Sequence, residues 1–425
     1  MFHPNFVFEI TLFSRFISRT FCGAFILSLT LCGVAQIGMT KEISPNEDYC
    51  REINDPSSGT EIVLNPGLYR ESCKVRRGGK PGFPLIIRGL SLKNRPRIEY
   101  QGKNGNVLEI YADNVLIEGL EFGPTHSDVD AIRIFSGDYI TVEDCGFEQI
   151  GGIAVVANHA SVKGIVARRN RIIDSTSTAM YFGCHDGLSC TISELLLEKN
   201  FISGVSARES EIGYGIQVKL NSTGIVRDNV IINTKGPGIM VYGASSLEKI
   251  NIVERNFVEK ARHSSGIVVG GGPTVVRNNV VVGNSDGGIA LEDYGRRGLL
   301  RKIVVTHNTI FGNDHGNILI SSEGSVEAEI SNNAFANREG APLLVGDRKN
   351  LRIVGNQDCA NISCFVDPEN RDFTPVKGSP LFEINKSFGS ARSPVDDYFT
   401  RTRGVDPVVG AIELPGGRIT LGIKP

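Results

Sequence analysis

Three residues of different chemistry fall on neighbouring repeats near the middle of this sequence. Lys219 and Tyr242 take equivalent places in two consecutive repeats, and His185 follows the matching run of the repeat before them. A cation stabilises negative charge that develops beside a carboxylate, and an imidazole or a phenol can remove or donate a proton. This set suits removal of the proton next to a uronic acid carboxylate. Elimination would then break the glycosidic bond, whereas return of the proton to the opposite face would be C5 epimerisation.

Other polar and aromatic residues are expected to bind the substrate around this set. They are Tyr181, Arg208, Gln217, Glu292, Arg296 and Arg297. The three arginines lie in long segments between repeats, 203–213 and 293–302, where loops on a rigid scaffold commonly carry function. We expect the arginines to bind flanking acidic sugars.

Each candidate also has an ordinary interpretation that the sequence leaves open. Lys219 could be a solvated charge on an exposed strand, and His185 could be a loop residue between two cysteines. Tyr181 and Tyr242 could be surfaces on which sugars stack, without an acid–base role. Glu292, followed by another carboxylate, could be part of the acid pair of a glycoside hydrolase.

The elements that must position these residues are repeats of a short alternating run that ends on asparagine. The runs are 166–170, 197–200, 225–229, 252–256, 275–279, 304–308 and 329–332, with Leu120 and Cys145 in the same place earlier. Successive end positions are 23 to 30 residues apart, a period that indicates a repeat architecture. We expect the asparagines to stack as a hydrogen-bonded ladder that begins at Asn170, because an unpaired buried amide is costly.

A second alternating run in each repeat begins with a small residue and isoleucine or methionine, as in 215–219 and 238–242. Strands that pair with their equivalents in the next repeat form parallel sheets without intervening helices, which a β-solenoid allows. The sequence therefore predicts an all-β parallel β-helix. Residues 36–104 are expected to form an N-terminal cap and first coils, 105–355 the repeats, and 356–425 a C-terminal capping segment.

The N-terminus and the cysteines favour export. Residues 1–35 have arginines before an apolar run and small residues at 33–35, as in a signal peptide, with a retained membrane anchor as the alternative. Three close cysteine pairs predict disulfides: Cys50 with Cys73, Cys184 with Cys190, and Cys359 with Cys364. Cys145 is expected to be a buried free thiol. We expect a secreted or periplasmic monomer with no membrane segment after signal cleavage, and the formal net charge of -2 gives no reason to expect nucleic acid.

The repeats resemble the right-handed parallel β-helix repeat proteins, the group that contains pectate lyases and alginate-active enzymes. The segments 64–69, 378–380 and 409–413 look like the beginning and the end common in that superfamily. The resemblance implies an acidic polysaccharide as partner and substrate, with a polysaccharide lyase as the first expectation. A C5-epimerase, a glycoside hydrolase and a non-catalytic carbohydrate-binding or surface-structural protein are the alternatives.

Two local resemblances are narrower. The segment around Lys219 looks like the lysine segment of the chondroitinase B and alginate lyase family, which carries a calcium-binding acidic pair before the lysine and an arginine on the next coil. This chain has Ile212 and Tyr214 near the first place and Tyr242 at the second. His185, with its two neighbours, is similar to the Pro-His-Asp segment of periplasmic alginate epimerases. Calcium is thus the one cofactor that the resemblance raises, and its acidic pair is missing here.

Overall fold

The computed structural model describes residues 39–424 except 57–59, 210, 245–247, 294–298, 323, 337–343, 347–348, 360–363 and 383–393. The segment 1–35, expected to be a signal peptide, therefore lies outside the described residues. None of the helices in the described part of the chain has the length and apolar character that a membrane crossing requires.

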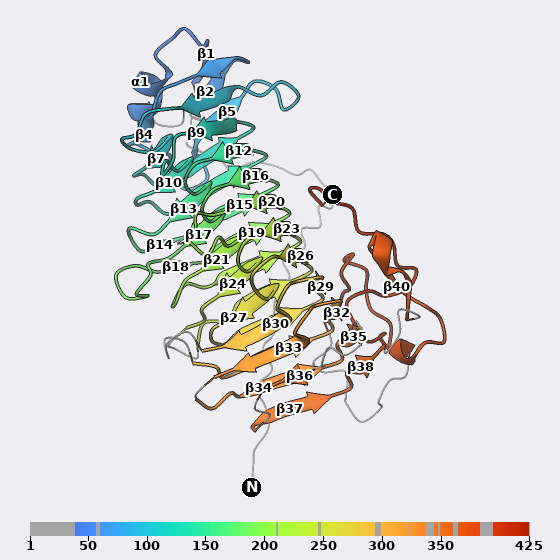
Figure 1. The fold of residues 1–425 in the computed structure, drawn as a ribbon. Coiled ribbons are helices and arrows are strands. Elements are labelled where there is room, and N and C mark those ends of the chain that lie inside the picture. The colour runs from blue at the N-terminus through green and yellow to red at the C-terminus, as the bar shows by residue number, and fades with distance from the viewer. Residues whose placement is uncertain are drawn as a thin grey trace, which may run out of the picture. The chain divides into compact units, whose positions relative to one another are not determined.

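Strands stacked in parallel form a solenoid with three long sheets (Figure 1). The first sheet has 13 strands: β1 (Thr40–Ile43), β2 (Glu61–Leu64), β5 (Leu85–Gly89), β8 (Val115–Glu118), β11 (Ile140–Glu143), β15 (Val166–Arg168), β19 (Leu195–Glu198), β22 (Gly224–Arg227), β25 (Asn251–Glu254), β28 (Thr274–Arg277), β31 (Ile303–Thr306), β34 (Ala328–Ser331) and β37 (Leu351–Val354).

The second sheet has 12 strands: β3 (Leu68–Tyr69), β6 (Arg97–Tyr100), β9 (Glu121–Thr125), β12 (Gly146–Ile150), β16 (Arg171–Ser175), β20 (Phe201–Val205), β23 (Val230–Thr234), β26 (Phe257–Ala261), β29 (Val280–Val282), β32 (Thr309–Phe311), β35 (Ala334–Ala336) and β38 (Gln357–Asp358). The third sheet has 11: β4 (Cys73–Val75), β7 (Leu108–Ile110), β10 (Ile132–Ile134), β13 (Val155–Ala157), β17 (Met180–Phe182), β21 (Ile216–Val218), β24 (Ile239–Val241), β27 (Ile267–Val269), β30 (Gly287–Glu292), β33 (Gly316–Ser321) and β36 (Leu344–Val345). A short pair, β14 (Val162–Lys163) with β18 (Ile192–Ser193), lies outside them.

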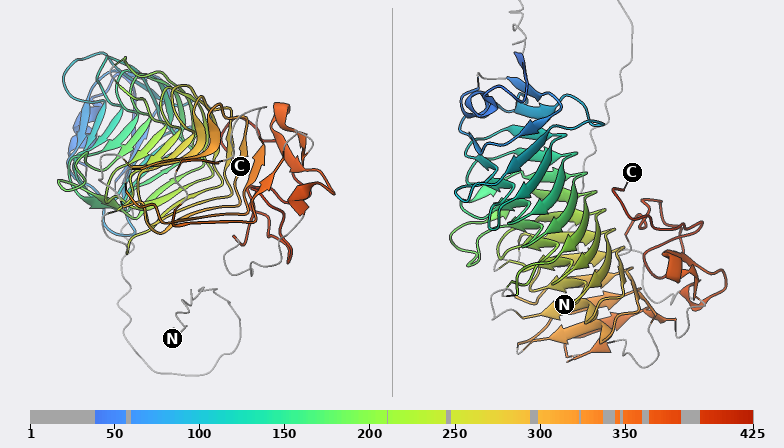
Figure 2. Two further views of the ribbon diagram at one scale, coloured as in Figure 1. Left: turned by 60° about the horizontal axis from the view of Figure 1, so that its bottom comes forward. Right: turned by 45° about the horizontal axis from the view of Figure 1, so that its top comes forward.

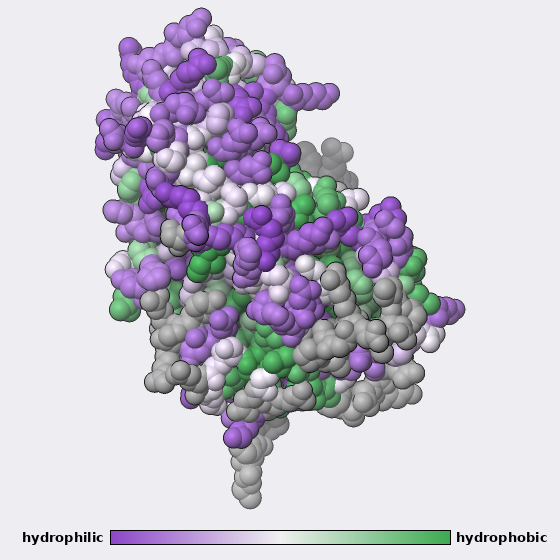
Figure 3. Space-filling view, in the orientation of Figure 1, coloured by the Kyte–Doolittle hydropathy of each residue, from purple (hydrophilic) through white to green (hydrophobic). Residues whose placement is uncertain are grey.

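Each coil passes through the first, second and third sheets in turn, and alternate side chains point into the solenoid. On the third sheet Val218, Val241 and Val269 are equivalent inward residues of successive coils and are at most 1% exposed. Apolar residues are thus drawn inside, and the face seen in Figure 3 is mostly hydrophilic over the N-terminal coils. The expected parallel β-helix is confirmed.

The asparagine ladder forms between the first and second sheets. Each amide nitrogen donates to the amide oxygen of the next member at 2.8–3.0 Å, through Asn170, Asn200, Asn229, Asn256, Asn279, Asn308, Asn333 and Asn356. The ladder begins at Asn170 as predicted. It uses Asn333 where the sequence pattern suggested Asn332. Asn332 has φ 52° and takes the left-handed position that precedes each ladder residue, as Asp228 does before Asn229.

A second, shorter ladder was not expected from the sequence. Asn284 donates to Asn313 at 2.7 Å between the second and third sheets, and the Asn284 oxygen accepts from the Ala261 amide. Both asparagines are fully buried. The same rule of pairing a buried amide with its copy one coil away holds at both corners.

The N-terminal coils carry the helix α1 (Tyr49–Asn54), whose first turn is capped by Asp48 accepting from the Arg51 amide at 2.9 Å. The predicted disulfide between Cys50 and Cys73 ties this helix to β4. The other two predicted disulfides, 184–190 and 359–364, are also present, and Cys145 is a buried free thiol as expected.

The C-terminal residues pack beside the second sheet (Figure 2). They include the antiparallel pair β39 (Phe365–Asp367) and β40 (Asp372–Pro375) and the short 3-10 helices η2 (Pro368–Asn370) and η3 (Pro380–Phe382). Outward residues of β23, β26, β29 and β35 form one apolar cluster with residues of this segment. The segment expected to cap the solenoid thus covers the outer face of the second sheet from β23 to β35.

Candidate functional site

The site is built on the outer face of the third sheet, where two columns of side chains run along the coils. The first column contains Tyr181, Gln217 and Met240, which are direct partners on β17, β21 and β24. The second column consists of the residues that come directly after the last inward residue of each strand, and it contains Lys219 and Tyr242. Their backbone amides donate to Phe182 and Val218 carbonyls at 2.8 and 3.0 Å, which keeps them in register.

Lys219 is the centre of this group. Its Nζ lies 3.3 Å from His185 Nδ1, 4.3 Å from the centroid of the Tyr242 ring and 5.2 Å from that of Tyr181. The residue is only 3% exposed. Two aromatic faces therefore flank a nearly buried amine, an arrangement that stabilises the ammonium ion through the ring quadrupoles.

His185 reaches Lys219 from a short loop closed by the Cys184–Cys190 disulfide. Asp186 organises this loop by accepting from the Leu188 and Ser189 amides at 3.0 and 2.9 Å. Hydrogen bonds from the Ser189 hydroxyl and from these amides lower the pKa of Asp186 to about 2. When the Lys219 ammonium donates to Nδ1, the His185 ring is neutral and carries its proton on Nε2.

The Tyr242 hydroxyl has two polar neighbours. Gln217 Nε2 and the Tyr214 hydroxyl each lie 3.4 Å from it. Tyr214 was not a candidate from the sequence. If inward and outward residues alternated back from Ile216, which points inward, the Tyr214 side chain would point inward as well. The strand begins only at Ile216, so alternation does not govern Tyr214, and its side chain contacts the outer group instead.

Tyr181 lies on the other side of Lys219, with its side chain half-buried. Burial, followed by the nearby Tyr242 and Asp186, raises the pKa of Tyr181 to about 12. The phenol is therefore neutral at physiological pH. It can donate a hydrogen bond there but is not a ready proton acceptor.

The remaining candidate residues lie apart from the group around Lys219 or outside the described residues. Arg208 sits at the other edge of the sheet, where its guanidinium pairs with Asp128 and, at 2.9 Å, with Glu211. Glu292 occupies the column of Tyr242 but two strands further along, roughly 10 Å away at ~4.8 Å per strand. Arg296 and Arg297 lie outside the described residues.

The described residues beside Lys219 include no cluster of three or more His, Cys, Asp or Glu side chains that could share a cation. Elsewhere among the described residues, one group of three carboxylates could share a cation: Glu118, Glu143 and Asp144 on the first sheet and its following turn. Two of the three already pair with arginines, at 3.0 Å for Glu143 and 2.5 Å for Asp144, both to Arg169. The family's acidic pair before the lysine has no counterpart in the described part of this loop.

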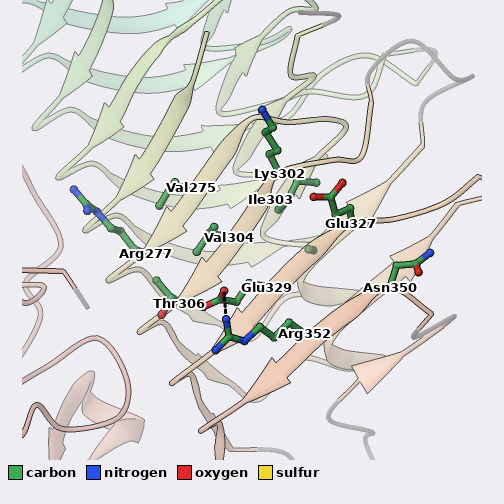
Figure 4. Close-up of a pocket in the computed structure, with 11 residues that line it drawn as sticks. Val275, Arg277, Lys302, Ile303, Val304, Thr306, Glu327, Glu329, Asn350 and Arg352 are labelled. Carbon is green, nitrogen blue, oxygen red and sulfur yellow. Dashed lines mark ion pairs between the residues drawn. The ribbon is translucent and has the colours of Figure 1, made fainter. Parts of the chain in front are cut away.

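A separate hollow of about 640 Å³ lies on the first sheet across β28, β31, β34 and β37 (Figure 4). Val275 and Val304 form its floor, and Arg352 pairs with Glu329 at 3.6 Å on one side. Its charged residues come from different strands and do not converge on one point in Figure 4. The group around Lys219 has the denser constellation of proton-transfer groups, so we place the candidate site there.

Comparisons with known proteins agree with the fold. Residues 130–300 match the family model described as right handed beta helix region. The alginate lyase from Paenibacillus sp. str. FPU-7 is 16% identical, with a TM-score of 0.52 over 74% of this chain and 99% of the lyase. No match to a curated protein was found by sequence. The fold is thus that of the right-handed parallel β-helix proteins.

Two further solved structures are similar at lower scores. The A-module of mannuronan C-5 epimerase AlgE4 from Azotobacter vinelandii is 14% identical, with a TM-score of 0.46 over 73% of this chain and 90% of that module. Pectate lyase Pel9A is 15% identical, with a TM-score of 0.43 over 88% of this chain and 97% of the lyase. The right-handed parallel β-helix fold that the resemblance implied is confirmed.

Proposed function

We propose that this protein is an exported enzyme that acts on an acidic, uronic acid-containing polysaccharide, most simply by β-elimination at Lys219. The observation that carries the proposal is the convergence of an ammonium, an imidazole at 3.3 Å and a phenol ring at 4.3 Å on one outer face. The names of the similar structures, which include alginate and pectate lyases and a mannuronan epimerase, support the same substrate class. Three disulfides support an oxidising compartment.

The geometry suggests an order of events. A uronate carboxylate binds the Lys219 ammonium, which then no longer donates to His185 Nδ1. The freed Nδ1 accepts the C5 proton, and Lys219 stabilises the negative charge that develops on the carboxylate. The C5–H electrons form the C4–C5 double bond, the C4–O bond breaks, and the leaving oxygen takes the proton of Tyr242. Tyr214 and Gln217 hold the Tyr242 hydroxyl in place.

Epimerisation uses the same first step. If Tyr242 instead returns a proton to C5 from the opposite face, the bond to the next sugar survives and only the configuration changes. The two reactions are distinguished by their product, since only elimination creates a double bond.

One observation favours a second candidate, a non-catalytic carbohydrate-binding protein. Lys219, Gln217 and Tyr242 are only 3%, 2% and 6% exposed, which restricts how closely a polymer can approach them. In that case glycan binding persists in Lys219→Met and no product forms.

The test is incubation of the purified protein with alginate, pectate and glycosaminoglycans. Unsaturated product is followed by ultraviolet absorbance and C5 configuration by NMR. We expect elimination on at least one polymer and a loss of about 10²- to 10³-fold in kcat for Lys219→Met, the size found when one preorganised charge-stabilising donor is removed. Lys302→Met, at an exposed lysine on another part of the solenoid, is the matched control and should retain full activity. No double bond and no change of configuration with any polymer would refute the enzyme proposal.

A further inference from the structure

An aromatic strip lies in the same outer column as Lys219, on coils nearer the N-terminus. Arg76, Tyr111 and Phe135 each follow a strand of the third sheet, β4, β7 and β10. The Tyr111 and Phe135 amides donate to Val75 and Ile110 carbonyls at 2.9 and 2.8 Å, so the residues are in register. They therefore stand in one row with Lys219 along the solenoid.

The side chains of this strip stack on one another. The Tyr111 and Phe135 rings are parallel, with centroids 4.8 Å apart and planes 4° apart, and His159 meets Phe135 edge-on at 5.0 Å. The Arg76 guanidinium lies 5.5 Å from the Tyr111 centroid, and that of Arg133 lies 5.8 Å from the Phe135 centroid. Three rings and two guanidinium groups thus form a continuous surface.

Stacking explains part of this arrangement, because paired rings on neighbouring strands stabilise a sheet. It does not account for what the strip presents to solvent. Rings that face each other turn their edges outward, and the edge of an aromatic ring carries partial positive charge. Arg76 is exposed and forms no ion pair with a carboxylate in the described part of the chain, and His159 is exposed as well. Two buried carboxylates lie under the strip, where Asp130 pairs with Arg133 at 2.6 Å and Glu109 accepts from the Tyr111 hydroxyl at 2.9 Å. Arg76 is therefore the exposed cation of an otherwise apolar outer surface, which suits an anionic ligand with many oxygen atoms.

The strip is also aligned with the candidate site. Between Phe135 and Lys219 the column contains Asn158 and Gly183, and the disulfide-closed loop that carries His185 begins directly after Gly183. Three strand spacings of ~4.8 Å separate Phe135 from Lys219, which is ~14 Å. A polymer lying along the column could touch both places, whereas a short oligomer at Lys219 could not.

We propose that Arg76, Tyr111, Phe135 and Arg133 form a distal binding surface for the acidic polysaccharide, several sugars from the position of bond cleavage. Sugar carboxylates contact the Arg76 guanidinium, and sugar oxygens contact the outward ring edges. Arg133, which already pairs with Asp130 at 2.6 Å, supports the Phe135 ring from below. The class of sugar rests on the function proposed above, but the surface itself is defined by its own contacts. Single-stranded nucleic acid also binds aromatic and basic surfaces. The chain's net charge of -2 and the alignment with Lys219 favour a saccharide.

The experiment measures affinity by calorimetry in the Lys219→Met background, so that no ligand is consumed. The probes are a uronate trimer and a uronate decamer prepared from alginate, from pectate and from a glycosaminoglycan. Arg76→Ala and Phe135→Leu should weaken decamer binding about fivefold to thirtyfold, the range for one or two lost charge and ring contacts, and leave trimer binding unchanged. Arg77→Ala is the matched control, since the neighbouring Arg77 is exposed and already pairs with Asp55 at 2.6 Å. It should not change either affinity.

Three results would overturn the proposal: equal decamer binding in all variants, equal weakening of trimer and decamer, or tighter binding of a single-stranded oligonucleotide than of any uronate. Failure of the proposed function is seen separately. In that case the strip still binds the decamer more tightly than the trimer, but the unsubstituted protein turns over no polymer. Failure of the strip alone shows as turnover whose KM for polymer is the same in Arg76→Ala. Thermal unfolding of each variant shows whether Phe135→Leu acts through stability, which would not alter the dependence on ligand length.

Discussion

Replacing an interior member of the asparagine ladder should cost far more stability than replacing its last member. In Asn256→Ala four hydrogen bonds disappear: two accepted from Asn229 and one each donated to Val226 and Asn279. At about 1 kcal/mol for each net bond, the loss is roughly 4 kcal/mol. The backbone N–H of Asn229 loses its acceptor, whereas the Asn229 side chain keeps its bond to the Leu197 carbonyl. Asn356→Ala removes bonds at a half-buried position where water can replace them, so we expect about 1–2 kcal/mol there.

Calorimetry at one scan rate measures the difference. With an unfolding entropy of about 2.1 cal/mol/K per residue over about 390 residues, 4 kcal/mol corresponds to a decrease in Tm of roughly 5 °C. Asn256→Asp is a sharper probe, because it keeps the acceptor for Asn229 but turns a carboxylate oxygen toward two other acceptors. It should be at least as destabilising as alanine. Equal shifts in Tm for the variants at 256 and 356 would refute the reasoning, since the ladder would then contribute no more inside the solenoid than at its end.

Three further predictions concern single groups. Cys184→Ser with Cys190→Ser should lower kcat/KM about tenfold or more, because the loop that holds His185 beside Lys219 is no longer closed; unchanged kinetics would exclude a role for this loop in catalysis. Ultraviolet difference titration of the unsubstituted protein against Tyr181→Phe should show one phenol that ionises near pH 12. The free energy of unfolding should also fall less between pH 10 and 12 in the variant than in the unsubstituted protein. The raised pKa of Tyr181 contributes stability below pH 10, and this contribution is lost as the pH rises to 12. Asn317→Leu should raise Tm by about 1–3 °C, because neither side-chain amide atom of this buried residue has a hydrogen-bond partner among the described residues. A lower Tm in the variant would contradict this prediction.

The sequence was most informative where a physical constraint recurs in every coil. The ladder start at Asn170 follows from the rule that a buried amide needs a partner, and that rule acts identically at each turn. Prediction was wrong by one residue at Asn332, because two asparagines in succession satisfy the pattern equally well. Only the backbone shows that the first of them takes the left-handed position. A repeated pattern therefore identifies the turn more firmly than it identifies the residue within it.

The site was less accessible to the same reasoning because it depends on residues outside the alternating runs. Tyr214 precedes its strand, and His185 follows one in a loop held by a disulfide. Both lie outside the strands, where the alternation of inward and outward residues does not apply. Alternation could place Lys219 and Tyr242 on the outer face, but it could not show which groups the loops bring to them.

The burial of Lys219 connects the fold to the proposed chemistry. An outward lysine on a solenoid is ordinarily solvated, whereas this one is 3% exposed between two tyrosine rings and a histidine. Holding an ammonium there costs desolvation, which the ring faces offset only in part. A substrate carboxylate would replace the lost solvation with a direct ion pair, and the gain is largest when charge on that carboxylate increases in the transition state. The burial of Lys219 that restricts access would thus stabilise the transition state more than the bound substrate. The effect of Lys219→Met on kcat, and not its effect on binding, therefore distinguishes an enzyme from a non-catalytic carbohydrate-binding protein.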